Sequence, residues 1–408
     1  MDAAAKAARK AELEVGLPAG WTAVVTATGE AMYCPSANLV PGNKKWEMQR
    51  ERPSISEGVP AGVPLRGGKA RPPFDKEGIT AEWLTAALHE RGHLPQAVKV
   101  ASLEPLINIG EGRGYANYSW KLVATYDKPV APDVPRKFVL KQLNQSFAPG
   151  SWPVGPMRVL SDRSYTLECT WYEQIRDRLP VPQPKLYWSG AESPANPTKD
   201  FGVYGVLMEW LGDDLKIVEG ADGISEEETI QAMRAVATLH AAWWNTEDTE
   251  TLKTLFTAEE SLAMIRGMMG GTEVAAEYAA TELTQALGEK FGAYVTAAVK
   301  TQEEWDFKGV TGDRNKVLCT WDLRTDNMVW RRTPGGPEDF ECVVIDHQVW
   351  SYGGAPCFDL ATFFGCSVTE EQMASRVDVG LRTYHETLVE MGVTTYSFDE
   401  LNQDFNRF

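Results

Sequence analysis

Two charged residues stand where the sequence pattern places apolar side chains, and they constrain the fold more than any other feature. Lys141 lies on the apolar face of a strand-like run at residues 137–143. Glu168 lies in line with the apolar stripe of a helix predicted over residues 157–179, which Pro180 ends. A buried ionised carboxylate needs a cation nearby. Lys141 either extends to the sheet edge or pairs with Glu168, and pairing requires the strand and the helix to pack together.

A glycine-rich turn precedes the strand that carries Lys141. Gly110, Gly112 and Gly114 lie between strand-like runs at residues 103–109 and 118–126. Without a Cβ atom, such a turn lets backbone amides approach phosphate groups closely. The alternative is an ordinary hairpin, because the chain has 35 glycines and the spacing is not Gly-x-Gly-x-x-Gly.

Three polar residues near the C-terminal end have the chemistry of a phosphate-transfer site. Asp322 and Asn327 lie in a loop between two short strands, and Asp346 ends the next apolar run. A hairpin of this kind brings all three side chains to one end. Asn327 and Asp346 offer the hard oxygen ligands that Mg²⁺ prefers when it bridges phosphates. Asp322 would orient an attacking hydroxyl or accept its proton, although Asp and Asn also commonly cap turns.

An apolar strand over residues 203–208 is followed by Glu209-Trp210-Leu211-Gly212. In a two-lobed nucleotide-binding protein this is the place of the hinge. We expect the backbone of Glu209 and Leu211 to meet the edge of the nucleotide base. Ser225 opens the next helix with a capping-box sequence, and its His240 is interpreted as a packed core residue rather than a base.

The pairing of Lys141 with Glu168 is the strand–helix ion pair that places a lysine on nucleotide phosphates. Further marks are Glu168 with Trp171-Tyr172, Leu239-His240-Ala241, Asp322 to Asn327, Ile345-Asp346-His347-Gln348, and Phe358-Asp359-Leu360-Ala361. By these residues the chain from about residue 75 onward resembles the aminoglycoside phosphotransferase and choline-kinase-like branch of the protein-kinase-like fold. It is most similar to the ecdysteroid-kinase-like (CHK) group.

This resemblance implies an α+β, two-lobed fold, with an antiparallel sheet and a helix in the N-lobe and a mainly helical C-lobe. It also implies ATP, Mg²⁺ and phosphorylation of a hydroxyl group on a small molecule. Aminoglycosides, choline, sterols and other alcohols are all compatible acceptors. By the same resemblance Asp359 is a structural acid.

The chain departs from the family just before Asp322. Thr320-Trp321 stands where the family has His-Gly, and a bulky Trp321 beside the acid is expected to narrow the acceptor site or to change the loop. The alternative function is therefore a nucleotide-binding pseudokinase that serves as a scaffold. The family also continues for further helices beyond the position of Phe408, so the chain is expected to be truncated.

The N-terminal region resembles a WW domain over residues 17–53. The marks are Leu17-Pro18-Ala19-Gly20-Trp21 and a second tryptophan, Trp46. By this resemblance Tyr33 and Trp46 would form a groove for a proline-rich peptide. The alternative is a small hairpin whose tryptophans only pack, and a peptide-binding adaptor without nucleotide chemistry is a third class of function.

Composition sets the remaining expectations. Residues 1–16 are expected to form a tail, 54–76 a Pro- and Gly-rich linker, and 77–408 the kinase-like domain. The net charge of −17 argues against nucleic acid and anionic membranes as partners. The six scattered cysteines, the lack of a signal-peptide pattern and the lack of a run of about 20 apolar residues predict a cytoplasmic protein without a membrane span.

Overall fold

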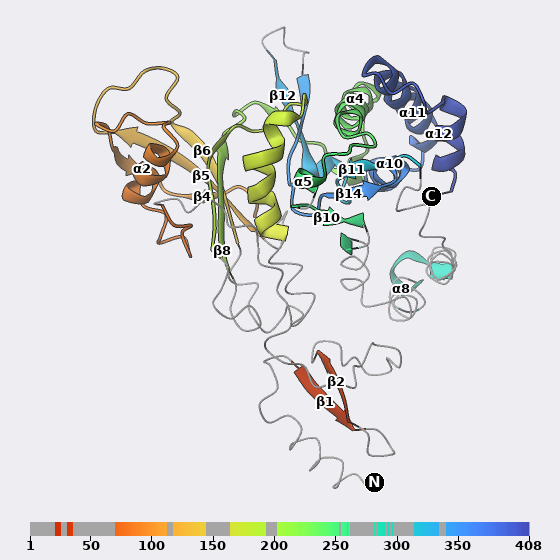
Figure 1. Ribbon diagram of the computed structural model, residues 1–408, viewed down its shortest axis with the longest axis horizontal. Coiled ribbons are helices and arrows are strands. Elements are labelled where there is room, and N and C mark those ends of the chain that lie inside the picture. Colours follow the sequence, from red (N-terminus) through yellow and green to blue (C-terminus); the bar gives the residue numbers. More distant parts are fainter. Residues whose placement is uncertain are drawn as a thin grey trace.

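A computed structural model of the chain describes residues 70–111, 117–143, 164–192, 202–252, 314–333 and 340–407, the two strands 21–25 and 31–35, and scattered residues between 254 and 296. In this part of the chain the protein is α+β, as predicted. An antiparallel sheet lies at one end and a group of helices at the other (Figure 1).

The first layer is a six-stranded sheet whose pairings are all antiparallel. Its strand order is β3-β5-β6-β8-β7, with β4 also paired to β5. The strands are β3 (Val100–Leu103), β4 (Ile107–Asn108), β5 (Asn117–Tyr126), β6 (Lys137–Leu143), β7 (Leu186–Glu192) and β8 (Val203–Glu209). Along β6 the side chains alternate, so Phe138 and Leu140 face one side while Val139 and Lys141 face the other.

Helix α2 (Ala81–Glu90) covers the face that carries Phe138 and Leu140. The Thr80 side chain caps its first turn by accepting from the Trp83 backbone N–H at 3.1 Å. Leu84 and Leu88 are fully buried against the sheet. The helix ends before Gly92, whose φ of +70° suits glycine.

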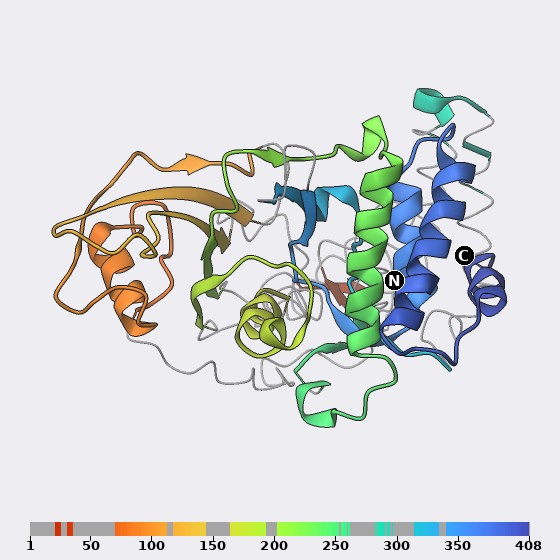
Figure 2. The same cartoon turned by 90° about the horizontal axis from the view of Figure 1, so that it is seen from above.

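The opposite face of the sheet packs on the helical segment 164–178 (Figure 2). The predicted apolar stripe is confirmed, because Glu168, Trp171, Tyr172, Ile175 and Leu179 are all buried. Residues 157–163 of the predicted helix lie outside the described residues, and 164–170 are α-helical. The sequence did not predict the turns that follow. Trp171–Ile175 forms a π-helical turn, in which the Arg176 backbone N–H donates to the Trp171 carbonyl, and a 3₁₀ turn follows. Such widened turns are common near functional sites.

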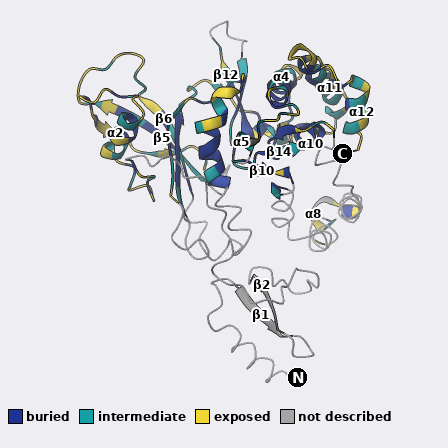
Figure 3. Cartoon of the chain, viewed as in Figure 1, coloured by how far each residue is buried: buried dark blue, intermediate teal, exposed yellow. Residues whose placement is uncertain are grey.

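The second layer is mainly helical. It contains α4 (Glu226–Ala242), α5 (Thr249–Leu252), α8 (Thr284–Leu287), α10 (Pro356–Ser367), α11 (Met373–Glu390) and α12 (Phe398–Phe405). The predicted capping box of Ser225 and Glu228 is present at the start of α4. Helix α4 packs along α11, and the outer sides of α11 and α12 are exposed (Figure 3).

Two small sheets lie between these helices and the six-stranded sheet (Figure 1). One has the order β13-β12-β9 and the other β10-β14-β11. Their strands are β9 (Leu215–Lys216), β10 (Phe256–Thr257), β11 (Val317–Cys319), β12 (Met328–Arg332), β13 (Phe340–Val344) and β14 (Ser351–Gly354). The β12–β13 hairpin agrees with the sequence, whereas β11 pairs with β14, a strand that the sequence did not predict.

The N-terminal region is described only in part. Strands β1 (Trp21–Val25) and β2 (Ala31–Pro35) pair antiparallel, close to the predicted runs. The rest of the WW-like region, the tail and most of the linker lie outside the described residues. The end of the predicted linker is bonded to the first layer, since the Gln142 side-chain amide donates to the Pro73 carbonyl and the Ala70 backbone N–H donates to Glu90.

Among the described helices, none combines the length and the apolar character needed to cross a lipid bilayer. Cys169, Cys319 and Cys342 are buried free thiols, as predicted.

Leu88→Ala tests the packing of α2 on the sheet. The variant removes a fully buried side chain and is expected to lower the free energy of unfolding by about 2–5 kcal/mol. Urea unfolding followed by tryptophan fluorescence measures it. Val389→Ala, at a side chain that is 42% exposed, is the control and should change stability by less than about 0.5 kcal/mol. Equal losses in both variants would contradict the packing.

Candidate active site

A buried cation lies where the two layers meet. Lys141 Nζ is 2.9 Å from Glu168 Oε1 and 3.0 Å from Asp346 Oδ1. The predicted Lys141–Glu168 ion pair is therefore confirmed, and Asp346 joins it from the end of β13. The side chains of Lys141 and Glu168 are only 12% and 3% exposed, while Asp346 is 34% exposed. Asp346 thus connects the buried pair to the open side of the site.

Burial and charge act in opposite directions on this cluster. Burial by itself would lower the pKa of Lys141, but the carboxylates of Asp346 and Glu168 outweigh it and raise that pKa. Lys141 is therefore a fixed positive charge. Burial raises the pKa of Glu168, and Lys141 opposes that shift.

Asp346 is held in an uncommon backbone conformation, with φ of +63°. Aspartate tolerates this left-handed region better than most residues. The next residue, His347, is fully buried and stacks on Trp171 at 4.5 Å between ring centroids. Burial and the nearby Lys141 hold the pKa of His347 well below its usual value, so its ring is neutral. The packing of His347 fixes the position of Asp346.

Asp322 and Asn327 form a second, connected pair. The Asn327 side-chain amide donates to both the backbone carbonyl and Oδ2 of Asp322, each at 2.8 Å. The Ile345 backbone N–H donates to the Asn327 carbonyl at 3.0 Å. The loop that carries Asp322 is thereby bonded to the strand that ends at Asp346. Because its amide nitrogen is engaged, Asn327 has its side-chain oxygen left to bind a cation.

Asp322 is half-exposed, at 45%. Burial raises the pKa of Asp322 and the negative charge of Asp346 adds to the shift, whereas Arg324 and Asn327 oppose it. The influence of Asp346 on Asp322 agrees with one shared site. The side chains of Asn327 and Asp346 offer an amide oxygen and a carboxylate, a donor set that fits Mg²⁺.

Asp359 of α10 anchors the loop before Asp322. Its carboxylate accepts from the backbone N–H groups of Thr320 and Trp321, at 2.7 and 3.0 Å, and from the Thr320 hydroxyl at 3.2 Å. The Thr320 oxygen also accepts from the Asp322 backbone N–H at 3.3 Å. The loop at Thr320-Trp321 is thus held by several hydrogen bonds, and the Thr320 hydroxyl makes two of them, one to Asp359 and one to the Asp322 backbone N–H.

A buried histidine completes this anchor. His240 Nε2 is 3.3 Å from Asp359 Oδ2, and its Nδ1 is 2.7 Å from the Tyr384 hydroxyl. His240, Cys319 and Asp359 also offer three ligand-type atoms within 4.8 Å of one another. Those atoms already have hydrogen-bond partners, including the Ala355 carbonyl for Cys319. We therefore interpret the three residues as a structural cluster.

Trp321 turns its side chain into the core. Its φ is +60°, a conformation that favours glycine. The indole N–H donates to the Ser351 hydroxyl, and the ring lies 4.5 Å from that of Phe358. The side chain is 4% exposed. Burial of the indole offsets the strain of the left-handed backbone.

The remaining predicted residues are dispersed or not described. Gly110 follows β4, where its backbone N–H donates to Asn108 Oδ1 at 3.2 Å. Glu209 is the last residue of β8. Its backbone N–H donates to the Lys185 carbonyl, and its side chain pairs with Arg331 at 3.3 Å. Leu211 follows in the connection to β9. The side chain of Tyr33 lies outside the described part of the chain, as do Trp46, Gly112 and Gly114.

Sequence reasoning missed Arg324, whose Nε lies 3.0 Å from Asp322 Oδ1. Its position in the sequence between Asp322 and Asn327 was the one feature that could have indicated a place in the site.

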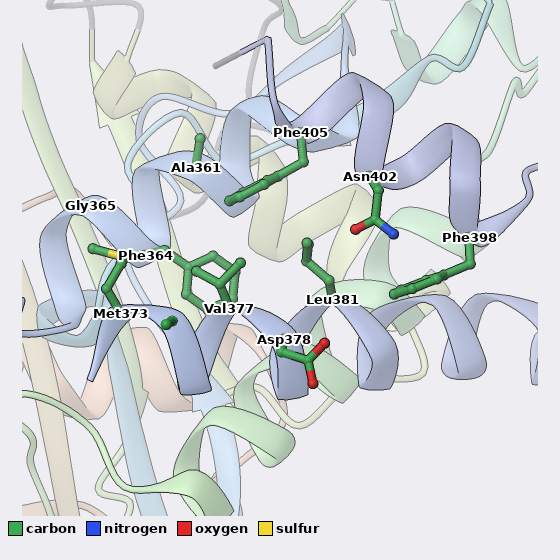
Figure 4. Close-up of a pocket in the computed structure, with 11 residues that line it drawn as sticks. Ala361, Phe364, Gly365, Met373, Val377, Asp378, Leu381, Phe398, Asn402 and Phe405 are labelled. Atoms are coloured by element: carbon green, nitrogen blue, oxygen red, sulfur yellow. The ribbon is translucent and has the colours of Figure 1, made fainter. Parts of the chain in front are cut away.

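A separate, largely apolar pocket of about 520 Å³ lies among α10, α11 and α12 (Figure 4). Phe364, Leu381 and Phe405 line it, with Asp378 and Asn402 as polar members. None of its lining residues belongs to the constellation of Lys141, Asp322 and Asp346.

Thr320→Val tests the loop anchor. The change keeps the shape but removes the hydroxyl that bonds Asp359 and the Asp322 backbone N–H. We expect a loss of about 1–3 kcal/mol in the free energy of unfolding, measured by chemical denaturation. Thr238→Val, which removes a hydroxyl bonded only within its own helix, should cost less. A larger loss in Thr238→Val would refute the anchor.

Trp321→Gly tests whether backbone strain or burial of the indole dominates the stability at this position. Glycine would relieve about 1–2 kcal/mol of backbone strain, whereas removal of a buried tryptophan costs about 3–5 kcal/mol. The variant should therefore be less stable by about 2 kcal/mol, as measured by chemical denaturation. A gain in stability would mean that the indole contributes little to the core.

Known proteins give the following comparisons. Choline kinase LicA from Streptococcus pneumoniae is 14% identical, with a TM-score of 0.37 over 75% of this chain and 86% of that one. An ethanolamine kinase from Plasmodium vivax is 13% identical, with a TM-score of 0.38 over 75% and 78%. An aminoglycoside-3'-phosphotransferase of type VIII is 16% identical, with a TM-score of 0.38 over 77% and 96%.

These scores mark a distant likeness. No curated protein matches the sequence. Residues 162–408 match the family DUF1679, which is described as "Uncharacterized oxidoreductase dhs-27". Because this match spans more than half of the chain, the protein belongs to the DUF1679 family.

Proposed function

We propose that the protein is an ATP- and Mg²⁺-dependent phosphotransferase that phosphorylates a hydroxyl group of a small molecule. The observation that carries the proposal is the convergence of Lys141, Asp346, Asn327 and Asp322 from separate elements. Phosphoryl transfer needs a cation on the nucleotide phosphates, oxygen ligands for Mg²⁺ and a carboxylate at the attacking hydroxyl. This set supplies each of them.

In this proposal Lys141, held by Glu168, contacts the nucleotide phosphates. Asn327 and Asp346 would hold Mg²⁺, which supplies charge neutralisation on the phosphates when bound. Asp322 orients the acceptor hydroxyl and takes its proton. The turn at Gly110, Gly112 and Gly114 covers the phosphates, and the backbone of Glu209 and Leu211 meets the base.

The charge balance supports a metal–nucleotide complex as the ligand. Among the described residues, this cluster contains four carboxylates, on Glu168, Asp322, Asp326 and Asp346, and two cations, on Lys141 and Arg324. A formally negative site repels a free polyphosphate and attracts divalent cations. ATP is therefore expected to bind as its Mg²⁺ complex.

The family description names an oxidoreductase, which suggests a different chemistry. Enzymes that bind nicotinamide dinucleotides in a doubly wound fold do so at the carboxyl edge of a parallel sheet. The six-stranded sheet next to Lys141 is antiparallel throughout. The side chains of Lys141, Asn327 and Asp346 favour phosphate and metal binding rather than that mode of dinucleotide binding.

The rest of the proposed organisation follows the sequence. Residues 17–53 form a WW-like module with Tyr33 and Trp46 as its groove for a proline-rich peptide. Residues 54–76 link it to the kinase-like domain 77–408. The pairing of β1 with β2 supports a hairpin in this region.

Asp322→Asn tests the proposed role of the acid. The variant keeps the shape of the side chain but cannot take a proton, so turnover should fall by about 10²–10⁴ while MgATP affinity changes little. Phosphorylation of a metabolite extract with labelled ATP measures turnover, and a thermal shift measures binding. Turnover at the parental rate in the variant would show that Asp322 is not the base.

Lys141→Met tests nucleotide binding separately. Loss of the ammonium leaves Glu168 and Asp346 without their cation, so the MgATP-dependent thermal shift should disappear. Replacing the exposed Lys137 of the same strand by methionine is the matched control and should keep the shift.

A parent protein that binds MgATP but transfers no phosphate to any compound of the extract would instead favour the pseudokinase scaffold. A parent that binds no nucleotide would overturn the proposal.

A further inference from the structure

Arg324 is a second cation beside the proposed base. Its Nε lies 3.0 Å from Asp322 Oδ1, and its Nη1 donates to Asp326 Oδ2 at 3.3 Å. The Nε atom is buried, yet in the part of the chain that the structure describes no acceptor is aligned with its N–H. The contact between Nε and Asp322 is therefore a charge contact between the guanidinium and the carboxylate.

The backbone around Arg324 is fixed on both sides. Its carbonyl accepts from the Asn327 backbone N–H at 3.0 Å. The backbone N–H of Thr325 donates to the Ser367 hydroxyl of α10 at 3.1 Å. Thr325 is fully buried, while the Arg324 side chain is 39% exposed. A loop with a fixed backbone therefore holds the partly exposed guanidinium beside Asp322.

We propose that Arg324 is the cation that contacts the transferred phosphoryl group, an inference that rests on the proposed function. Among the basic side chains of the described residues, Lys141 is engaged by Glu168 and Asp346 at the inner end of the site. Arg324 touches the carboxylate that would hold the attacking hydroxyl. The phosphoryl group must pass between the nucleotide and that hydroxyl, so it comes within reach of the guanidinium.

The chemistry explains why a cation is needed there. The bond from the γ-phosphorus to the oxygen that bridges it to ADP breaks, and ADP leaves with the electron pair. A bond forms from the acceptor oxygen to phosphorus, and the acceptor proton passes to Asp322. During this step negative charge spreads over the three outer phosphoryl oxygens. A guanidinium presents several N–H donors in a planar fork that matches such oxygens.

Before nucleotide binds, the same guanidinium rests on Asp322 and Asp326. Both ion pairs are half-exposed, so they contribute little to stability. They leave Arg324 free to exchange a carboxylate for the phosphoryl oxygens without unfolding the loop. The variant Arg324→Gln is therefore expected to fold.

The experiment compares the full-length parent with Arg324→Gln and with Arg382→Gln as a matched control. Arg382 is exposed on α11, where it pairs with Asp378 of its own helix and lies 5.2 Å from the centroid of the Phe398 ring. Thermal shifts are recorded with MgADP alone and with MgADP plus aluminium fluoride, which imitates the phosphoryl group in flight. This measurement needs no acceptor. ATP turnover is measured beside it with the metabolite extract.

We expect Arg324→Gln to bind MgADP within about threefold of the parent, but to lose at least about tenfold in affinity for the fluoroaluminate complex. Its turnover should fall by about 10²–10³, the usual effect of one missing donor to a developing anion. Arg382→Gln should match the parent in all three measurements. Arg324→Lys keeps the charge but lacks the fork, and should fall between the parent and Arg324→Gln.

Equal affinity of Arg324→Gln and the parent for the fluoroaluminate complex would overturn the role of Arg324 and leave the proposed function standing. Loss of turnover only with acceptors that carry an anionic group, with unchanged fluoroaluminate affinity, would assign Arg324 to acceptor binding and would also overturn it. Failure of the parent to bind MgADP would overturn the proposed function, and this inference would fall with it.

Discussion

The positive charge of Lys141 is the interaction on which the arrangement of the two layers depends. An ammonium group at the middle of an apolar sheet face is tolerated only because Glu168 and Asp346 both touch it. Glu168 comes from the helical segment that covers the sheet, and Asp346 comes from the far layer. One cation thus joins a strand, a helix and the returning strand of a second sheet. Removal of Lys141 would leave the buried carboxylate of Glu168 without a cation, so these positions depend on one another.

Asp359 has the corresponding role for the loop of the proposed base. A single carboxylate gathers two backbone N–H groups, a threonine hydroxyl and a histidine. Because two of these four partners are backbone N–H groups, half of the anchor does not depend on the side chains at 320 and 321. The Thr320 hydroxyl bonds Asp359 and the Asp322 backbone N–H, and the Trp321 indole is buried in the core. The altered motif therefore leaves Asp322 bonded to Asn327.

Much of this arrangement is readable from the sequence. Glu168 could be assigned to a buried stripe because its neighbours at helical spacing are apolar, and its partner followed from the scarcity of buried cations. Asn327 and Asp346 could be paired because two short strands and a turn separate them. A local sequence pattern shows which side chains are buried when a helix or strand has one clear hydrophobic period.

Other features depend on contacts that no local pattern encodes. Strand β14, with the sequence Ser-Tyr-Gly-Gly, lacks the alternation of a strand and exists because β11 lies beside it. The direction of the Arg324 side chain follows from the extended backbone before a 3₁₀ turn. The left-handed conformation of Trp321 is contrary to residue preference and is permitted only by tertiary packing. These are properties of the assembled fold.

The π-helical turn at Trp171–Ile175 has a consequence for comparing this chain with its relatives. A turn closed by a bond from residue i+5 holds one residue more than an α-helical turn. A relative whose helix is regular throughout needs one residue fewer to bring the same side chains to the sheet. Correct alignment then calls for a single-residue gap within this turn, placed after Glu168. An ungapped alignment would shift every later position of the helix by about 100° around its axis.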